Sequence, residues 1–266
     1  MRGTLTPAPA DLARAGLRLD LDQPATGAAT VTLSRPERRN AMTPGTWRGL
    51  AAIGRSLPHG VRVVVVRGDG PSFSAGIDLR LLGADGVAGE EPLPSPTDAG
   101  FEDWIASCQD GFGWLHDPSI VSVAAVRGHA IGAGFQLALA CDLRILTDDA
   151  RLSMREPTLG LVPDLMGTKP LVDIVGLPRA LELCLTGRSV VAEEARELRL
   201  AELVVPAGDL DAATADLVAA ILTLDPSTAR ATKRLLAQAP GHTLEQQAAA
   251  ERRAQAALQR ERLTGG

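Results

Sequence analysis

Residues 128–137 read Gly-His-Ala-Ile-Gly-Ala-Gly-Phe-Gln-Leu and follow directly on an apolar run that extends from Ile120 to Val126. A short apolar run that ends at a glycine is typical of a buried strand feeding a tight turn. A helical pattern comes next, so the stretch predicts a strand, a glycine turn and the start of a helix. Free N–H groups at the start of a helix attract negative charge, and the turn is therefore a candidate anion-binding site.

A second stretch of the same kind precedes it. The apolar run from Val61 to Val66 ends at a glycine-rich turn, and residues 73–79 then read Phe-Ser-Ala-Gly-Ile-Asp-Leu. Taken alone, this segment is more typical of an ordinary strand-ending turn. Small residues would nevertheless let the backbones of both turns approach a ligand closely, and four positions have this property: Ala75, Gly76, Gly132 and Gly134.

Strands alternate with helical patterns in the first part of the chain, which indicates an α/β or α+β fold. Alternating apolar residues over 17–21 and a β-rich run over 29–33 predict a short hairpin across Pro24–Gly27. Residues 83–99 lack periodicity and predict a surface loop or a lid. From Pro178 onward the residues predict mostly helix. We therefore expect three parts: a loose lead-in over 1–16, an α/β core over 17–205 and a helical region over 206–266.

The composition excludes several classes of function. The chain has 266 residues, 45% of them hydrophobic and 22% charged, and a net charge of −5. This balance leaves no broad cationic surface for nucleic acid or anionic lipid. Cys108, Cys141 and Cys184 are widely spaced without a CxxC motif, so neither a disulfide framework nor a zinc site is indicated. No apolar run approaches the roughly 18 residues of a membrane span. We expect a cytoplasmic protein without nucleic-acid or membrane partners.

The glycines of the first stretch also resemble part of a dinucleotide-binding fingerprint. Gly132 and Gly134 have the right spacing, and an acidic residue follows about twenty positions later. Leu137, however, stands where that fingerprint needs Gly or Ala for helix–sheet packing, and the motif does not open a first βαβ unit. A nicotinamide-dependent oxidoreductase is therefore the weaker interpretation.

Three segments together resemble the crotonase superfamily, the enoyl-CoA hydratase/isomerase family. Residues 33–42, Leu-Ser-Arg-Pro-Glu-Arg-Arg-Asn-Ala-Met, look like its early signature, residues 73–79 like its first oxyanion loop, and residues 123–142 like its second. The resemblance implies an α/β fold, a crotonase-like spiral of ββα units with a helical C-terminal region, assembled as a homotrimer or as a homohexamer of paired trimers. It also implies that the thioester oxygen of an acyl-CoA lies between the backbone N–H groups of Ile77 and Ala133.

The chemistry of a thioester explains such an architecture. Removing a proton beside the thioester carbonyl creates an enolate with its charge on oxygen, which two preorganised N–H donors in a dry pocket stabilise. A carboxylate must still move the proton. Family hydratases use two glutamates, and the resemblance places Gln136 and Glu156 at their positions. Because a carboxamide orients water but does not carry a proton, hydration by two glutamates is impaired here.

Asp164 follows Glu156 and completes the candidate catalytic residues. The dienoyl-CoA isomerases of the superfamily place a Glu and an Asp at this spacing, although they carry Asp where Gln136 stands. We therefore expect double-bond isomerisation first; a hydratase with altered water activation and a non-catalytic acyl-CoA-binding protein are the alternatives. The competing interpretation of Glu156 is a surface acid paired with Arg151 or Arg155. No metal or redox cofactor is expected, and coenzyme A enters as part of the substrate.

Further residues are candidates for substrate contacts. Arg38 and Arg39 suit the phosphates of coenzyme A, because guanidinium groups bind phosphate oxygens, and a solvated surface role fits them equally. Lys233 resembles a position on family helices near the nucleotide end of coenzyme A, often in a neighbouring subunit, against a default of an exposed lysine. Asp142 and His129 are expected to form structural hydrogen bonds. Loop positions expected near the acyl-CoA are Ala75, Gly76, Asp78, Gly132 and Gly134.

Overall fold

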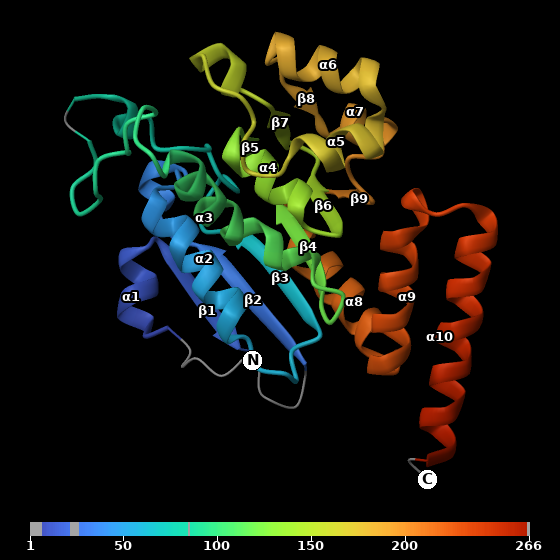
Figure 1. The fold of residues 1–266 in the computed structure, drawn as a ribbon. Helices are drawn as coiled ribbons and strands as arrows, with labels where there is room; N and C mark the ends of the chain where they lie inside the picture. The colour runs from blue at the N-terminus through green and yellow to red at the C-terminus, as the bar shows by residue number, and fades with distance from the viewer. Residues whose placement is uncertain (1–6, 22–26, 85, 265–266) are drawn as a thin grey trace.

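The computed structural model describes residues 7–21, 27–84 and 86–264, so most of the turn predicted at Pro24–Gly27 lies outside the described residues. A six-stranded sheet forms the centre of the molecule (Figure 1). Strand β1 is antiparallel to β2, which confirms the predicted hairpin pairing, and every later pair of neighbours is parallel. The strands lie in the order β1 (Leu17–Leu21), β2 (Ala28–Leu33), β3 (Val63–Gly68), β4 (Val121–Val126), β6 (Leu143–Thr147) and β9 (Leu203–Val205).

A small second sheet carries the glycine turn of residues 128–137. It is built from β5 (His129–Ile131), β7 (Arg151–Ser153) and β8 (Val190–Val191), with β7 in the middle. Strand β5 is parallel to β7, and β8 is antiparallel to it. An isolated bridge joins Ser74 to Ala130, so the turn that follows β3 lies directly against β5. The two candidate turns therefore meet where the two sheets adjoin.

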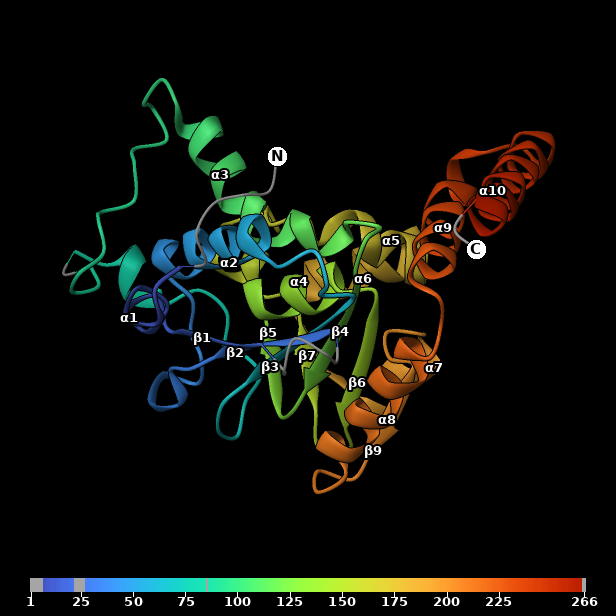
Figure 2. The ribbon, with the colours of Figure 1, turned by 90° about the horizontal axis from the view of Figure 1, so that it is seen from below.

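Helices cover both faces of the six-stranded sheet. Figure 2 shows α2, α3 and α4 on one face and α8 on the other. Short 3-10 turns include η2 (Leu79–Leu82) and η4 (Glu156–Leu159). The helices of the described residues are α1 (Pro9–Arg14), α2 (Pro44–Ser56), α3 (Phe101–Gly113), α4 (Ala133–Ala140), α5 (Thr168–Val175), α6 (Leu177–Thr186), α7 (Ala192–Glu197), α8 (Leu210–Leu222), α9 (Pro226–Gln238) and α10 (Leu244–Thr264).

The run of valines in β3 is apolar throughout because both of its faces are covered. Side chains alternate across a strand, so neighbouring valines enter different cores. Val64 and Val66 belong to the large core beneath α2 and α4, whereas Val63 and Val65 pack in a smaller core beneath α8. A strand buried on both faces carries a continuous apolar run instead of an alternating one. The structure confirms the strand predicted from the apolar run at Val61, and β3 begins two residues later, at Val63.

Three helices near the N-terminus were not predicted. The lead-in expected to be loose contains α1, which buries Leu12. Helix α2 begins at a capping box formed by Thr43 and Thr46, with proline in the first turn. Helix α3 lies beside α2. The two backbones approach so closely at Gly111 that a Cβ there would come within 2.6 Å of the Trp47 carbonyl oxygen. Residues 86–99 between η2 and α3 contain neither helix nor strand, as predicted.

The C-terminal region is helical, which confirms the prediction. Helix α8 packs on the sheet, whereas α9 and α10 form a pair that extends away from the body (Figures 1 and 2). Helix α9 has no buried residue, and the side chains of α10 that are described are all exposed or half-buried. Among the described residues, no helix combines the length and apolar character needed to cross a membrane.

Candidate active site

The first turn presents one unpaired backbone N–H group. Met42 donates its N–H to the Gly76 carbonyl at 2.7 Å, and Asp78 donates its N–H to the Met42 carbonyl at 2.8 Å. In this parallel bridge the N–H of the intervening Ile77 points away from Met42. Within the described residues, this N–H group donates no hydrogen bond.

The second turn presents another unpaired backbone N–H group. Gly132 donates its N–H to the Ser153 carbonyl in β7 at 2.8 Å, which fixes the start of α4 against the small sheet. Gly132 has a φ of 52° and a ψ of −121°, a conformation that essentially requires glycine. Ala133 is the first residue of α4, and its N–H group lacks a partner among the residues that the structure describes.

The two turns lie close enough for both N–H groups to act on one atom. A Cβ on Gly76 would come within 2.6 Å of the Ile131 carbonyl oxygen and within 3.6 Å of the Ala133 nitrogen. A Cβ on Gly134 would come within 2.7 Å of the Ser74 carbonyl oxygen. Glycine is thus required at the contact between the turns, and the paired N–H groups have the composition of an oxyanion hole.

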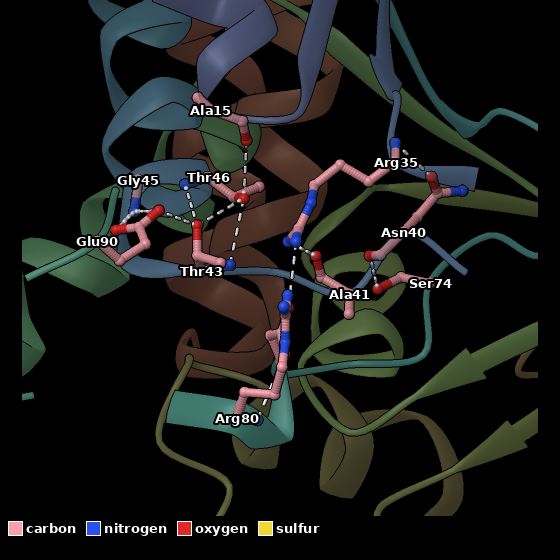
Figure 3. A network of polar contacts seen from close by, with 11 residues as sticks. Ala15, Arg35, Asn40, Ala41, Thr43, Gly45, Thr46, Ser74, Arg80 and Glu90 are labelled. Carbon is pink, nitrogen blue, oxygen red and sulfur yellow. Dashed lines mark hydrogen bonds and ion pairs between the residues drawn. The ribbon is translucent and has the colours of Figure 1, made fainter. Parts of the chain in front are cut away.

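Residues of the early signature, 33–42, hold the first turn in place through hydrogen bonds (Figure 3). Asn40 donates from its side-chain amide to the carbonyl oxygens of Asp69 and Ser72, at 2.9 and 2.8 Å, and its own carbonyl accepts from the Ser74 hydroxyl. Arg35 bonds the Ala41 carbonyl at 2.7 Å. Residues 35–41 therefore hold the turn that carries Ile77.

Asp78, expected to contact substrate, belongs to the same support. Its buried carboxylate accepts hydrogen bonds from Arg80 and from Arg35. The paired Arg80 guanidinium, helped by Arg35 and by the Arg80 backbone N–H, lowers the pKa of Asp78 to about 2. Asp78 does not line the cavity described below, and both of its oxygens are engaged in holding the first residues of η2.

Glu156 begins η4, and its side chain points into the same region. A Cβ on Gly132 would come within 3.1 Å of Glu156 Oε1. The carboxylate is buried, Oε1 accepts a hydrogen bond from Gln136 at 2.6 Å, and Oε2 has no partner within the described part of the chain. Burial raises the pKa of Glu156. The competing interpretation of Glu156 as a surface acid paired with arginine is wrong, since Arg151 and Arg155 bond backbone carbonyls instead.

Gln136 is completely buried in α4, and its carboxamide joins two segments. Its Oε1 accepts from the backbone N–H groups of Leu165 and Gly167 at 2.9 and 3.2 Å, while its Nε2 donates to Glu156. The side chain thus fixes one oxygen of the Glu156 carboxylate and leaves the other unpaired. Gln136 is a positioning residue in this geometry, because its carboxamide holds Glu156 on one side and two backbone N–H groups on the other.

Asp164 lies next to the segment that Gln136 holds. Its carboxyl group is half-buried, and burial raises its pKa. Its backbone carbonyl accepts a hydrogen bond from Gln109 of α3 at 2.7 Å. Asp164 and Glu156 line one cavity, so the structure brings together two carboxyl groups whose pKa values are both raised.

A cavity of about 620 Å³ unites these groups. Both unpaired N–H positions, both carboxyl groups and Gln136 border it. Leu93, Pro94 and Pro96 of segment 86–99 line part of the cavity, and the role of this loop as a lid stays a prediction. The remaining wall is apolar and mostly aromatic or branched, and includes Trp47, Leu82, Leu93, Phe101, Trp104, Ile105 and Leu161. Such a cavity suits an acyl chain next to a site of proton transfer.

Segment 86–99 is fastened to the start of α2 (Figure 3). The Glu90 carboxylate accepts the Gly45 N–H at 3.0 and 3.2 Å and the Thr43 hydroxyl, and it pairs with Arg48 at 3.4 Å. A carboxylate at this position satisfies an N–H group that the helix leaves free and interacts favourably with the helix dipole.

Comparison with known proteins identifies the family. The family model described as enoyl-CoA hydratase/isomerase matches residues 24–264. The chain belongs to the enoyl-CoA hydratase/isomerase family. It is 55% identical to a protein of Thermobifida fusca YX assigned as an enoyl-CoA hydratase, whose structure in complex with CoA matches with a TM-score of 0.93 over 97% of this chain and 98% of that chain. The complex of that protein with acetoacetyl-CoA matches with a TM-score of 0.92 at 55% identity, over 96% of this chain and 99% of that chain.

A relative of different activity is also similar. The mitochondrial Delta(3,5)-Delta(2,4)-dienoyl-CoA isomerase of Dictyostelium discoideum is 29% identical over 86% of this chain and 79% of its own length. The enoyl-CoA hydratase/isomerase family is enzymatic, and its crotonase fold agrees with the predicted α/β architecture with C-terminal helices. The dinucleotide-binding interpretation of the glycine turn is wrong.

Ala75, Gly76 and Gly132, expected near the acyl-CoA, line the cavity, whereas the three basic residues expected to reach coenzyme A lie outside it. Arg38 and Arg39 are exposed, so their contact with CoA phosphates stays a prediction. Lys233 of α9 is half-buried and not exposed: its ammonium donates to the carbonyls of Leu115, Asp117 and Ile120 and pairs with Asp142 at 2.7 Å. This network ties α9 to the body of the enzyme.

Two structural predictions can be compared with the contacts. Asp142 forms structural hydrogen bonds, as expected, accepting from the backbone and hydroxyl of Ser122. His129 contacts the Ser72 hydroxyl at 3.4 Å. Cys108, Cys141 and Cys184 are free, and the described residues contain no cluster of His, Cys, Asp or Glu suited to a metal.

Sequence reasoning missed the aromatic wall of the cavity. Trp47, Phe101 and Trp104 come from α2 and α3, two helices that were not predicted. One signal was present: the chain has no tyrosine and only seven aromatic residues, three Trp and four Phe, and two of them lie three residues apart at 101 and 104. Residues one helical turn apart share a face, which indicates a helix with an aromatic side.

Proposed function

We propose that this enzyme shifts a double bond in an enoyl-CoA or dienoyl-CoA through a thioester enolate. The observation that carries the proposal is a single buried glutamate, Glu156, with one oxygen fixed by Gln136 and the other unpaired, beside two unpaired backbone N–H groups. Isomerisation can reuse one base, because the proton leaves one carbon of the acyl chain and returns to another.

In the proposed mechanism, the thioester oxygen accepts hydrogen bonds from the N–H groups of Ile77 and Ala133. Glu156 Oε2 takes a proton from the carbon between the thioester and the double bond, and the electron pair of the broken C–H bond moves toward the oxygen. The resulting enolate is conjugated with the original double bond. When the proton returns to the far carbon of that double bond, the electron pair moves back from the oxygen and the double bond takes its new position. The raised pKa of Glu156 suits this task, because a carboxylate in water is too weak a base for a carbon acid.

Asp164 is the proposed second proton carrier, required where the two carbons are too far apart for one carboxylate. The reaction is redox-neutral and charge is stabilised by backbone N–H groups, so we propose that it needs no metal or redox cofactor and that coenzyme A serves only as part of the substrate. The CoA and acetoacetyl-CoA complexes of the Thermobifida fusca relative support an acyl-CoA substrate.

Hydration is the second candidate, and one observation favours it. Asp164 shares the cavity with Glu156 and has a raised pKa, so in this candidate it activates the water in place of Gln136, whose carboxamide oxygen already accepts two backbone N–H groups. The hydratase assignment of the same relative points in this direction.

Label exchange in deuterated water tests both candidates. Wild type, Glu156→Gln, Asp164→Asn and the surface control Glu193→Gln are incubated with enoyl-CoA of several chain lengths, and deuterium uptake, double-bond position and hydration are followed separately by mass spectrometry and NMR. Glu156→Gln should lose exchange, Asp164→Asn should slow isomerisation with little change in acyl-CoA affinity, and Glu193→Gln should match wild type. Exchange in Glu156→Gln at the wild-type rate refutes the role of Glu156 as the base. If wild type exchanges deuterium with none of the substrates, the non-catalytic acyl-CoA-binding alternative is supported instead.

We also propose that α9 and α10 pack against other copies of the chain in a trimer or a hexamer of paired trimers. Helix α9 has no buried residue, and Leu236, Leu244 and Leu263 are exposed along the two helices, as expected of surfaces that other copies of the chain would cover. Light scattering tests the assembly, and a monomer near the chain mass of 27.8 kDa contradicts it.

A further inference from the structure

Two buried side-chain atoms in the described residues lack a hydrogen-bond partner, and both belong to residues that line the same cavity. One is Glu156 Oε2, which the proposed function uses as the base. The other is Trp47 Nε1. Whereas the ionised carboxylate of Glu156 only accepts hydrogen bonds, the indole N–H group of Trp47 only donates them. Buried polar atoms are nearly always paired, so an unpaired donor in a ligand cavity indicates a partner supplied by the ligand.

Trp47 is held in place by its helix and its neighbours. Its side chain is 4% exposed, and its backbone is pressed against Gly111 of α3. Its ring meets that of Trp104 edge to face, with centroids 6.4 Å apart and planes inclined by 68°, and Trp104 in turn stacks on Phe101 at 5.8 Å. The indole nitrogen is therefore a fixed donor in an otherwise apolar wall. A buried tryptophan N–H usually has a hydrogen-bond partner, so packing alone does not explain an unpaired one.

Three other polar side chains of the cavity form hydrogen bonds within the protein. Gln136 uses its amide on Glu156 and on two backbone N–H groups. Arg155 bonds the Gly187 carbonyl, and the Thr158 hydroxyl bonds the Arg155 carbonyl. With the N–H groups of Ile77 and Ala133 assigned to the thioester oxygen, Trp47 Nε1 is a further buried donor on a residue of this cavity that the described part of the protein leaves unpaired.

We propose that Trp47 is a specificity residue and that the preferred acyl group carries a hydrogen-bond acceptor oxygen beyond the thioester carbonyl. This inference names the substrate class of the proposed site. A plain hydrocarbon chain would fill the cavity and leave the indole N–H desolvated and unpaired, whereas an oxygenated chain pairs it. Sites built around a hydrogen bond discriminate strongly against analogues that lack the group.

Binding of unreactive ligands tests the proposal independently of catalysis. Titration calorimetry compares octanoyl-CoA with a set of oxo-octanoyl-CoAs that differ only in which carbon of the distal half bears the ketone. One oxo ligand should bind wild type about tenfold more tightly than octanoyl-CoA. Trp47→Phe should abolish this preference, while Trp104→Phe, which removes an indole from the same wall, should weaken both ligands alike and keep it.

Equal affinity of wild type for octanoyl-CoA and every oxo ligand overturns the proposal, and it would mean that the ring face of Trp104 satisfies the Trp47 N–H. A preference that survives in Trp47→Phe overturns it as well. Should Trp47→Phe not fold, wild type labelled with nitrogen-15 tryptophan decides: of the three indole signals, the one of Trp47 should move downfield with the oxo ligand and not with octanoyl-CoA. Because these ligands do not react, failure of the isomerase proposal would leave the result unaffected.

Discussion

Replacing Gln136 by methionine should loosen the active site in two measurable ways. Methionine has nearly the same length and shape but accepts no hydrogen bond of comparable strength, so the buried N–H groups of Leu165 and Gly167 lose the acceptor that holds them at 2.9 and 3.2 Å. Each buried donor left unpaired costs about 1–3 kcal/mol, and the two together should lower the free energy of unfolding by about 2–6 kcal/mol.

The second effect concerns Glu156, which loses the 2.6 Å hydrogen bond that fixes its Oε1. Deuterium exchange should slow in Gln136→Met even when the protein is fully folded. Urea unfolding followed by circular dichroism gives the stability, and exchange under folding conditions gives the activity. A wild-type urea midpoint for Gln136→Met would refute the structural role of the carboxamide, and a wild-type exchange rate would refute its hold on Glu156.

Gln136→Glu is the matched control, because its carboxylate still accepts both backbone N–H groups. Two carboxyl groups 2.6 Å apart do not both ionise, so the pair should retain one proton near neutral pH. Gln136→Glu should therefore be more stable than Gln136→Met at pH 6, and should lose this advantage as the pH rises and the shared proton leaves. It should also raise the ratio of hydration to isomerisation, since it restores a second proton-carrying group.

Three further predictions concern separate parts of the site. Because burial raises the pKa of Glu156 in the folded state, wild type should lose stability as the pH rises from the ordinary glutamate value through the raised one, while Glu156→Gln should not; parallel urea midpoints across that window would contradict this. Gly132→Ala should cost about 1–3 kcal/mol in urea unfolding and slow exchange, because its backbone requires glycine and the new methyl group meets Glu156; unchanged exchange would count against the contact. Lys233→Met should lower the unfolding free energy by about 1–3 kcal/mol without changing CoA affinity in calorimetry; weaker CoA binding would instead support the predicted contact with the nucleotide.

Local sequence patterns were sufficient to predict the strands and the helix start that carry the first and second turns. Continuous valines predicted β3, and small residues after β4 predicted the start of α4, because burial on both faces and close backbone approach each leave a mark in the sequence. The family motifs then placed Glu156 and Asp164, and the structure brings both carboxyl groups to one cavity.

The partners of Gln136 could not be predicted in this way. Its carboxamide bonds N–H groups 29 and 31 residues further along the chain, and no periodicity reports such a contact. Helix α2 was missed because its start depends on a capping box at Thr43, a local signal outside the motifs on which the interpretation rested. With α2 unassigned, Trp47 had no predicted place, and its part in the apolar wall was missed.

The attachment of Glu90 to the start of α2 concentrates the control of access to the cavity at a single point. Segment 86–99 forms no helix or strand, so little in its own backbone opposes its displacement, whereas the carboxylate that fastens it is only 9% exposed and weakly screened by salt. Helix α2 also carries Trp47 in its first turn, so the segment and the wall share one anchor. A ligand that left past Leu93 and Pro94 would first have to break the contacts of Glu90 with the start of α2, and its residence time would then depend on a residue outside the cavity lining.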